Sequence, residues 1–277
     1  MKYLNLGCGS HYCSLKEWIN IDFSSVDKYV KSHNLLEGIP CKDNTFDATY
    51  HSHVLEHFSK EDGAVFVKEC FRVLKKGGVL RIVIPDLERI AKKYLHFLEK
   101  GIESPSDKLT EANYEWMKIE MLDQVARHKN GGNMIKVLSK KVLINEEFIF
   151  ERIGEEGKGL REQLISEDIK TSSIISVKKK KPLLRKLKYY LRNKVLNVLG
   201  VDQKHTELGK FRLKGEIHQW MYDRYSLTKL LEENGGIDIE VKNAFSSYIP
   251  NWENYNLDGE NNITRKPDSL FIECKKG

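Results

Sequence analysis

Apolar residues in the first part of the chain come in short runs that end at polar or small residues. Such runs cover Tyr3–Leu6, Trp18–Asp22 and Phe46–His51, and a run rich in β-branched residues, Val79–Ile84, ends before a proline. Runs of this length, bounded by turn-forming residues, are typical of buried strands. We predict a strand at each of the four positions.

The segment between the last two predicted strands has a different spacing of apolar residues. Between Glu61 and Lys76 the apolar residues recur every three or four positions, which predicts a helix lying on a sheet. The residues of this stripe are Val65, Phe66, Cys70, Val73 and Leu74. Lys75–Gly78 supplies cations and glycines that predict the end of the helix. Alternating strands and helices favour an α/β fold with a doubly wound, parallel, Rossmann-like sheet.

The C-terminal part resumes this pattern. Ser226–Asn234 is predicted as a helix, and Ile237–Val241 and Ser269–Cys274 as strands. We therefore predict one Rossmann-like core from residues 1–88 and 216–277. Residues 89–215 show helical stripes with little strand character, and they predict a largely helical insertion after the fifth strand that caps or borders the site.

Composition narrows the class of protein. The 277 residues are 40% hydrophobic, but no run approaches the roughly 18 apolar residues of a membrane helix, and the N-terminus lacks a secretion-signal pattern. The five cysteines are scattered and include no Cys-x-x-Cys, so we predict reduced thiols rather than disulfides or a zinc site. We expect a cytoplasmic protein.

The net charge of +6 comes from one segment, because Lys178–Lys194 contains nine Lys or Arg and no acidic residue. Residues 178–199 also place an apolar stripe on one helical face. This pattern favours a peripheral helix at an anionic membrane or, equally, an amphipathic helix packed on its own domain. Binding to nucleic acid ranks third, because no RNA-binding signature accompanies the charge.

Candidate binding residues follow the first two strands. Gly7 and Gly9 let the backbone turn sharply and let a ligand approach closely. In a doubly wound sheet, ligands bind outside the carboxyl ends of the strands, where Gly7, Cys8, Gly9 and Asp22 would lie. A dinucleotide site would need a third glycine where Tyr12 stands, which argues against NAD.

Asp22 can accept hydrogen bonds from both hydroxyls of a ribose, because a carboxylate has two acceptor oxygens. It can also simply cap a helix. Phe23 is predicted either to pack against an adenine or to belong to the core.

The combined motifs resemble class I S-adenosylmethionine-dependent methyltransferases. They are LNLGCGS, NIDFSS, and IPCKDNTFDATYHSHVLEHF followed by ECFRVLKKGGVLRIVIPD, and they cover about residues 1–88 and 216–277. The chain is most similar to small methyltransferases of bacterial surface-polysaccharide and lipopolysaccharide biosynthesis. The insertion resembles that group through YEWMKIEMLDQVARHKNGGNM and HQWMYDRYSL.

The resemblance implies S-adenosylmethionine as cofactor, with its amino acid portion over Gly7 and Gly9. It places Asn5 where an acidic residue often precedes the first glycine. It places Asn34, with Leu35, at the adenine. It also puts Ser52 and His53 at the end of the fourth strand, near the reactive end of the cofactor.

Methyl transfer from a sulfonium is an in-line displacement, so the enzyme must align the reactants and, for a hydroxyl acceptor, remove a proton. Our catalytic candidates are His53 and two carboxylates, Glu120 and Asp123, in the predicted helix Tyr114–Arg127. Glu120 and Asp123 form a polar stripe with Gln124 and Arg127, and the alternative for this stripe is a solvated helix face. Four residues before the C-terminal helix are predicted either to close over the pocket or to pack against it: His218, Trp220, Tyr222 and Arg224.

His53 and His57 are spaced to share one helical face and could in principle hold a metal ion. No third ligand stands at a convincing spacing, so we expect no metal site.

Three functions remain open at this point. The first is O-methylation of a sugar or glycan, free or lipid-linked, in surface-polysaccharide biosynthesis. The second is methylation of a small acceptor such as a quinone or secondary metabolite, for which a drier and more aromatic pocket is expected. The third is a non-enzymatic adaptor that uses the basic segment at a membrane surface or on nucleic acid.

Overall fold

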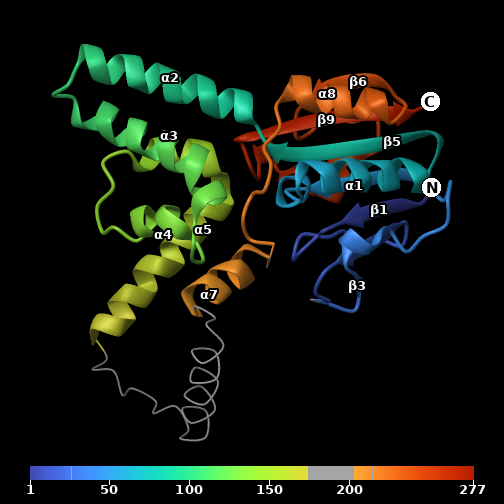
Figure 1. Cartoon of the computed structure of the whole chain (residues 1–277), viewed down its shortest axis with the longest axis horizontal. Coiled ribbons are helices and arrows are strands. Elements are labelled where there is room, and N and C mark those ends of the chain that lie inside the picture. Colours follow the sequence, from blue (N-terminus) through green and yellow to red (C-terminus); the bar gives the residue numbers. More distant parts are fainter. Residues whose placement is uncertain (26, 174–202, 214) are drawn as a thin grey trace, which may run out of the picture.

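The computed structural model describes residues 1–25, 27–173, 203–213 and 215–277, and its centre is a seven-stranded sheet (Figure 1). The strand order is β3-β2-β1-β4-β5-β9-β6. The bounds are β1 Tyr3–Leu6, β2 Trp18–Asp22, β3 Val30–Ser32, β4 Phe46–Ser52, β5 Leu74–Pro85, β6 Gly236–Lys242 and β9 Ser269–Lys276. Strands β1 to β5 are parallel, so the predicted doubly wound α/β fold is confirmed.

The C-terminal strand differs from the expected parallel arrangement. Strand β9 lies between β5 and β6 and runs antiparallel to both. The segment from β6 to β9 contains the short 3-10 helix η3 (Trp252–Tyr255) and the hairpin of β7 (Gly259–Glu260) with β8 (Ile263–Thr264). An antiparallel neighbour needs no helical crossover, which explains why this connection can lack an α-helix.

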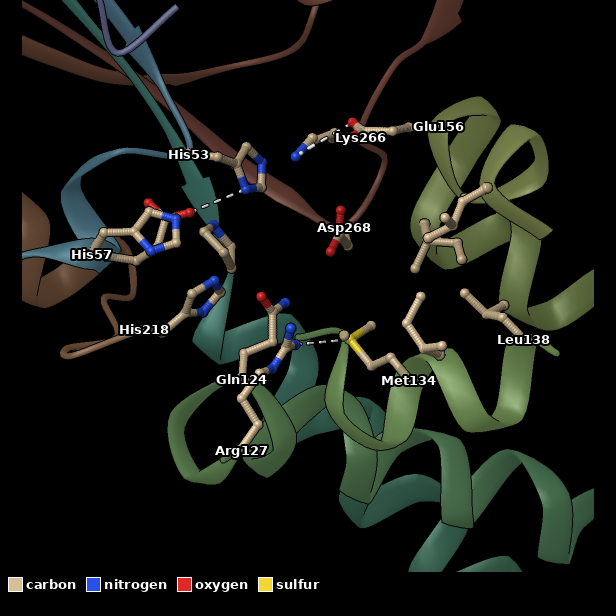
Figure 2. A pocket seen from close by; sticks show the side chains of 17 residues that line it. His53, His57, Gln124, Arg127, Met134, Leu138, Glu156, His218, Lys266 and Asp268 are labelled. Carbon is tan, nitrogen blue, oxygen red and sulfur yellow. Dashed lines mark hydrogen bonds and ion pairs between the residues drawn. The ribbon is translucent and has the colours of Figure 1, made fainter. Parts of the chain in front are cut away.

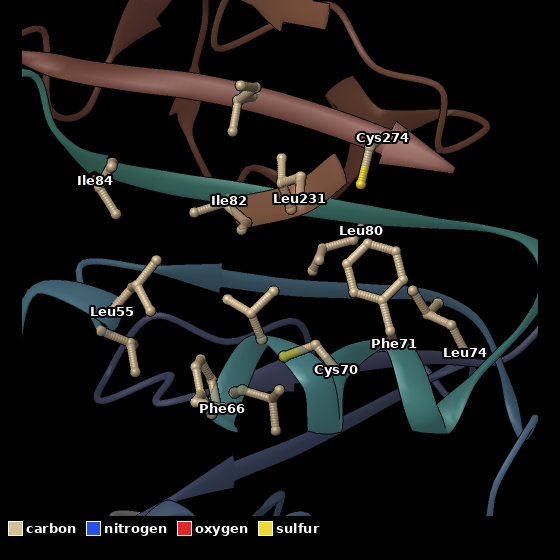
Figure 3. Close-up of a cluster of buried hydrophobic side chains, with 14 of the residues drawn as sticks. Leu55, Phe66, Cys70, Phe71, Leu74, Leu80, Ile82, Ile84, Leu231 and Cys274 are labelled. Atoms are coloured by element: carbon tan, nitrogen blue, oxygen red, sulfur yellow. The ribbon is translucent and has the colours of Figure 1, made fainter. Parts of the chain in front are cut away.

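One face of the sheet is covered by α1 (Lys60–Val73) and α8 (Arg224–Glu233). Figure 3 shows Phe66, Cys70 and Phe71 of α1 directed at the strands, with Leu231 of α8 in the same cluster. Ser59 caps α1 by accepting a hydrogen bond from the Asp62 amide. Of the predicted helical stripe, Phe66, Cys70 and Val73 of α1 belong to this core, Leu74 joins it from β5, and Val65 is exposed.

The predicted helix end at Lys75–Gly78 is wrong. Helix α1 ends at Val73, and β5 begins at Leu74, which pairs with Phe46. Gly77 has a φ of 73°, and a Cβ on Gly78 would lie 2.8 Å from the carbonyl oxygen of Lys75. The glycines thus allow an irregular start to β5 instead of stopping a helix.

The other face of the sheet carries a mainly aromatic core formed with the segment before β7. Its centre is Arg81, whose buried guanidinium donates to Asp258 at 2.8 Å and to Glu273 at 2.7 Å. The ring of Trp252 lies 4.5 Å from the guanidinium carbon. These contacts fix the irregular segment on the sheet, where a buried charge needs partners on every side.

The chain between β5 and α8 forms a helical layer beside the sheet, on the side away from both termini (Figure 1). Its helices are α2 Leu87–Glu103, α3 Lys108–Ala126, α4 Gly132–Leu138, α5 Glu146–Ser173 and α7 Gln203–Arg212. The chain returns to the sheet where it left, because Asp86 and Tyr222 form an isolated parallel bridge. The basic segment 178–199 lies outside the described residues. No described helix is both long and apolar enough to cross a membrane.

Candidate functional site

The strand order reverses between β1 and β4, which is where a doubly wound sheet binds its ligands. Gly7 follows β1, and His53 follows the last residue of β4. A small pocket of about 40 Å³ opens at this point. It is lined by Asn5, Gly7, Cys8, His11, Tyr50, Ser52, Arg265 and Lys266. The structure therefore brings four predicted site residues, Asn5, Gly7, Cys8 and Ser52, into one pocket.

The glycine turn is connected directly to the second strand. Gly7 and Gly9 have φ values of 63° and 53°, a conformation that favours glycine. Asp22 accepts hydrogen bonds from the Gly9 amide at 2.8 Å and from the Ser24 amide at 3.0 Å, one on each carboxylate oxygen. Each oxygen keeps a second lone pair, so the carboxylate can still accept from a diol.

The turn leaves room for a ligand. A Cβ on Gly9 would meet nothing within 4 Å, whereas a Cβ on Gly7 would lie 2.4 Å from a methyl carbon of Val54. Gly7 is therefore needed for packing, and Gly9 lies at an open position. Burial raises the pKa of the Cys8 thiol to about 12, with a smaller contribution from Asp22, so Cys8 stays neutral.

The remaining predicted cofactor residues differ in how far their side chains are already engaged. Asn5 is buried and donates to the His11 carbonyl and to Asn20, both at 3.3 Å, so it supports the turn. Asn34 caps η1 (Leu35–Glu37), and Leu35 packs against the core. Phe23 is 74% exposed at the end of β2, so it does not belong to the core and lies free to contact a ligand.

Arg265 is a pocket residue that the sequence patterns missed. It follows β8, its Nη2 lies 3.5 Å from the hydroxyl of Ser52, and its buried Nε has no hydrogen-bond partner. A buried donor without a partner is costly. An anionic group in the small pocket would satisfy it, which fits the carboxylate of an amino acid.

A larger cavity of about 410 Å³ lies beside this pocket, between the sheet and the insertion (Figure 2). His53, Glu56, His57 and His218 form one wall. Gln124, Arg127, Lys266 and Asp268 add polar groups, and aliphatic side chains of α4 and α5 form the opposite wall: Met134, Ile135, Leu138, Ile153 and Leu160. Its size suits a ligand of small-molecule dimensions.

The imidazole wall surrounds a buried carboxylate. Glu56 is 1% exposed, and Nδ1 of His53 lies 3.2 Å from its Oε1. Burial by itself raises the pKa of Glu56, but the opposing effect of His53, with His57 and His218, holds this pKa well below its ordinary value. His53 has a φ of 55°, and strain of this kind in a residue other than glycine is common at functional sites.

His218 is held in a neutral state. Burial lowers its pKa to about 3 against the attraction of Glu56. The rings of His57 and His218 lie edge to face with centroids 5.1 Å apart. The neutral ring keeps a lone pair on one nitrogen, which can accept a hydrogen bond or bind a metal ion.

The structure corrects the prediction for Glu120. This carboxylate is buried in the insertion, where Arg152 donates to both of its oxygens and Trp116 donates at 3.1 Å. Burial raises the pKa of Glu120, while Arg152 opposes that change. Glu120 is not among the described residues that line the cavity. We assign it to the core of the insertion.

Asp123 likewise points away from the cavity. It accepts hydrogen bonds from the amides of Asn133 at 2.8 Å and Met134 at 3.4 Å, and it pairs with Arg127 at 3.5 Å. These contacts cap the beginning of α4. The polar stripe contributes to the cavity through Gln124 and Arg127 instead.

The four residues named before the C-terminal helix were predicted either to close over the pocket or to pack against it, and the structure shows both. His218 lines the cavity, and Tyr222 belongs to the sheet core. Trp220 is 41% exposed, and Arg224 pairs with Glu88 at 2.8 Å. Asp268, just before β9, was missed because a single acidic residue beside a proline carries no sequence signal.

Comparison with known proteins adds to this geometry. Residues 4–82, which contain β2 to β4, α1 and most of β1 and β5, match a family model described as a methyltransferase domain. The matched range is less than a third of the chain, so the match is a likeness of this part to methyltransferase domains. Of the predicted site residues, Asn5 to Gly9, Asp22, Phe23, Asn34, Leu35, Ser52 and His53 all fall inside the matched range, and their individual roles stay predictions.

Solved structures that are similar to this chain include the cyclase SpnF, which is 21% identical over 30% of this chain, with a TM-score of 0.24. The match spans only 38% of the length of SpnF. An S-adenosylmethionine-dependent methyltransferase from Thermotoga maritima is 12% identical over 100% of this chain and 82% of its own, with a TM-score of 0.39. One from Archaeoglobus fulgidus is 13% identical over 99% and 86%, with a TM-score of 0.38. No curated protein matches the chain.

Proposed function

We propose that this protein transfers the methyl group of S-adenosylmethionine to a hydroxyl of a sugar or glycan in surface-polysaccharide biosynthesis. The observation that carries the proposal is the 410 Å³ cavity, which lies beside the glycine turn of the methyltransferase domain and has a polar wall. A sugar hydroxyl needs hydrogen-bond partners and a proton acceptor close to the methyl group. The cavity offers both.

S-adenosylmethionine fits the residues at the point where the strand order reverses, between β1 and β4. Asp22 would hold the ribose hydroxyls, Phe23 would contact the adenine, and the unpartnered Nε of Arg265 would pair with the amino acid carboxylate. S-adenosylmethionine supplies an electrophilic methyl group, so the chain's own residues need only bind, orient and accept a proton. The described residues that line the cavity include no serine, threonine or cysteine, which agrees with this chemistry.

Two side chains face the cavity where the proton of an acceptor hydroxyl can go. His53 lies at the end of β4, between the small pocket and the cavity, and remains the predicted catalytic residue. Asp268 lines the same cavity and lies near Lys266 (Figure 2). A carboxylate here can accept from a sugar hydroxyl and orient it. Gln124 and Arg127 supply donors for further hydroxyls.

The aliphatic wall favours a second class of acceptor. The side chains of α4 and α5 offer apolar contact that a free monosaccharide does not need. A lipid-linked glycan or a small hydroxylated metabolite such as a quinol would use both walls. The basic segment 178–199 supports the lipid-linked case by its sequence alone, through attraction to anionic lipid. We expect salt-sensitive binding to anionic vesicles in that case.

The experiment is transfer of labelled methyl groups from S-adenosylmethionine to three acceptor pools: simple glycosides, polyprenyl-linked glycans and quinols. Label in either glycan pool, absent after boiling the enzyme, supports the proposal. Label in quinols alone, or in no pool although the cofactor binds, contradicts it. Binding of the cofactor is measured separately by calorimetry, so that a misfolded preparation is recognised.

A further inference from the structure

Glu56, His57 and His218 form a compact group of side chains that could hold a metal ion. One candidate ligand atom from each lies within 4.8 Å of the others. Zinc with nitrogen and oxygen ligands at about 2.0–2.2 Å requires ligand atoms about 3.3 Å apart in tetrahedral geometry. Small rotations of the side chains cover this difference. Two histidines and one carboxylate are a common ligand set for divalent transition metals.

The carboxylate of Glu56 is the strongest sign that a partner belongs here. Glu56 is 1% exposed, and neither of its side-chain oxygens has a hydrogen-bond donor. Nδ1 of His53 makes an ion-pair contact of 3.2 Å with Oε1, which leaves Oε2 without a partner among the described residues. Buried carboxylates are normally paired, hydrogen-bonded or bound to a metal. A cation between Glu56 and the two imidazoles would satisfy it.

The ring of His57 is oriented as a metal-binding histidine is. Its Nδ1 lies 3.0 Å from the carbonyl oxygen of Ile217. A carbonyl only accepts, so Nδ1 carries the proton and the lone pair is on Nε2. A histidine that ligates through one nitrogen usually donates from the other to a carbonyl or carboxylate, which fixes the ring.

Backbone hydrogen bonds hold the segment of Glu56 and His57 against the segment that contains His218, without any ion. The amides of Gln219 and Trp220 donate to the carbonyl oxygen of Glu56 at 2.7 and 3.3 Å. The amide of His218 donates to the carbonyl oxygen of Gln124 at 3.0 Å, and the Gln219 side chain donates to the carbonyl oxygen of His57 at 2.7 Å. The three side chains are thus directed at one another by the fold, as pre-organised ligands should be.

We propose that Glu56, His57 and His218 bind a divalent transition-metal ion, with Zn²⁺ as the representative, in the wall of the 410 Å³ cavity. The sequence spacing gave no third ligand for the pair of His53 and His57. The fold instead places Glu56 and His218 beside His57. Three protein ligands leave a coordination position for water or for an oxygen of the acceptor. This last role rests on the proposed function, whereas the binding of the ion does not.

The first test is calorimetric titration of metal-free protein with Zn²⁺ in wild type, Glu56→Gln, His218→Ala and the control His96→Ala, whose ring is exposed on α2. We expect one equivalent to bind wild type and the control, with at least tenfold weaker binding in the two cluster variants. Circular dichroism confirms that each variant is folded, and Glu56→Gln keeps the side-chain shape. Absence of binding to wild type, or equal binding to all four proteins, overturns the proposal.

The second test uses Co²⁺, whose visible absorption reports its ligands. We expect wild type and His96→Ala to give the intense bands of a four- or five-coordinate site with nitrogen and oxygen ligands, and Glu56→Gln and His218→Ala to give only the weak bands of the hydrated ion. Hydrated-ion bands from wild type contradict the site. S-adenosylmethionine binding to metal-free protein is measured in parallel, because it is expected to be unchanged and reports on the proposed function independently.

Discussion

The glycine turn after β1 and the imidazole wall lie at the same edge of the sheet but are built in opposite ways. The turn uses Gly7, Gly9 and Asp22, which are joined by a hydrogen bond across neighbouring parallel strands. The wall joins His53, Glu56 and His57 to His218, which arrives only after the whole insertion. The first arrangement is local enough to be visible in the sequence. The second arrangement depends on where the chain returns to the sheet after the insertion.

This contrast predicts that substitutions in different regions have different effects. Changes near β1 and β2 should alter cofactor affinity, changes in the cavity should alter transfer with the cofactor still bound, and changes to the buried carboxylates of the insertion should alter stability alone.

Glu120→Gln should cause the largest loss of stability. It leaves the guanidinium of Arg152 buried without its counter-charge, and breaking a buried pair in this way costs about 3–5 kcal/mol. Urea denaturation measures the loss. The double variant Glu120→Leu with Arg152→Met should recover most of it, because it removes both charges. A fall in the methyl-transfer rate without a fall in stability would restore Glu120 as a catalytic residue.

Asp268→Asn should lower the rate of methyl transfer about 100-fold, because it removes a proton acceptor in the cavity while keeping the size of the side chain. Steady-state kinetics with the accepted substrate measure kcat, and calorimetry should show unchanged affinity for S-adenosylmethionine. An unchanged kcat would leave His53 as the remaining candidate for this role.

Asp123→Ala should destabilise the protein by about 1 kcal/mol, because the amides at the beginning of α4 lose their acceptor. Asp123→Asn, which keeps an acceptor oxygen, should lose less. Thermal unfolding of both variants is the measurement. A loss of kcat that is the same in both variants, with wild-type stability, would contradict the capping role.

The sequence predicted the parallel strands well because their residues are buried on both faces and end at clear turn signals. Tyr3–Leu6 and Trp18–Asp22 are confirmed to the residue. The start of β5 and the direction of β9 were not predictable, because irregular pairing at Leu74 and strand direction depend on neighbours distant in sequence. The three-residue strand β3 is too short to leave a pattern.

The sequence predicted residues that the structure gathers at one pocket, Asn5, Gly7, Cys8 and Ser52, but not the carboxylates that line the cavity. Glu120 and Asp123 were chosen from a polar helical stripe, and such a stripe does not distinguish a carboxylate that faces a cavity from one that faces an arginine or a helix end. Glu56 and Asp268 carried no signal, since their roles depend on burial and on the hairpin before β9. Function resides in this placement more than in residue type.

The most direct test of the account is calorimetric titration of wild type and Asp22→Ala with S-adenosylmethionine. NAD is the control ligand, and Asp43→Ala is the control variant, because Asp43 precedes β4 at the opposite edge of the sheet. We predict binding by wild type and Asp43→Ala, and about 100-fold weaker binding by Asp22→Ala, which loses two charge-assisted hydrogen bonds to the ribose. Equal affinity of wild type and Asp22→Ala, or binding of NAD in place of S-adenosylmethionine, would contradict the account.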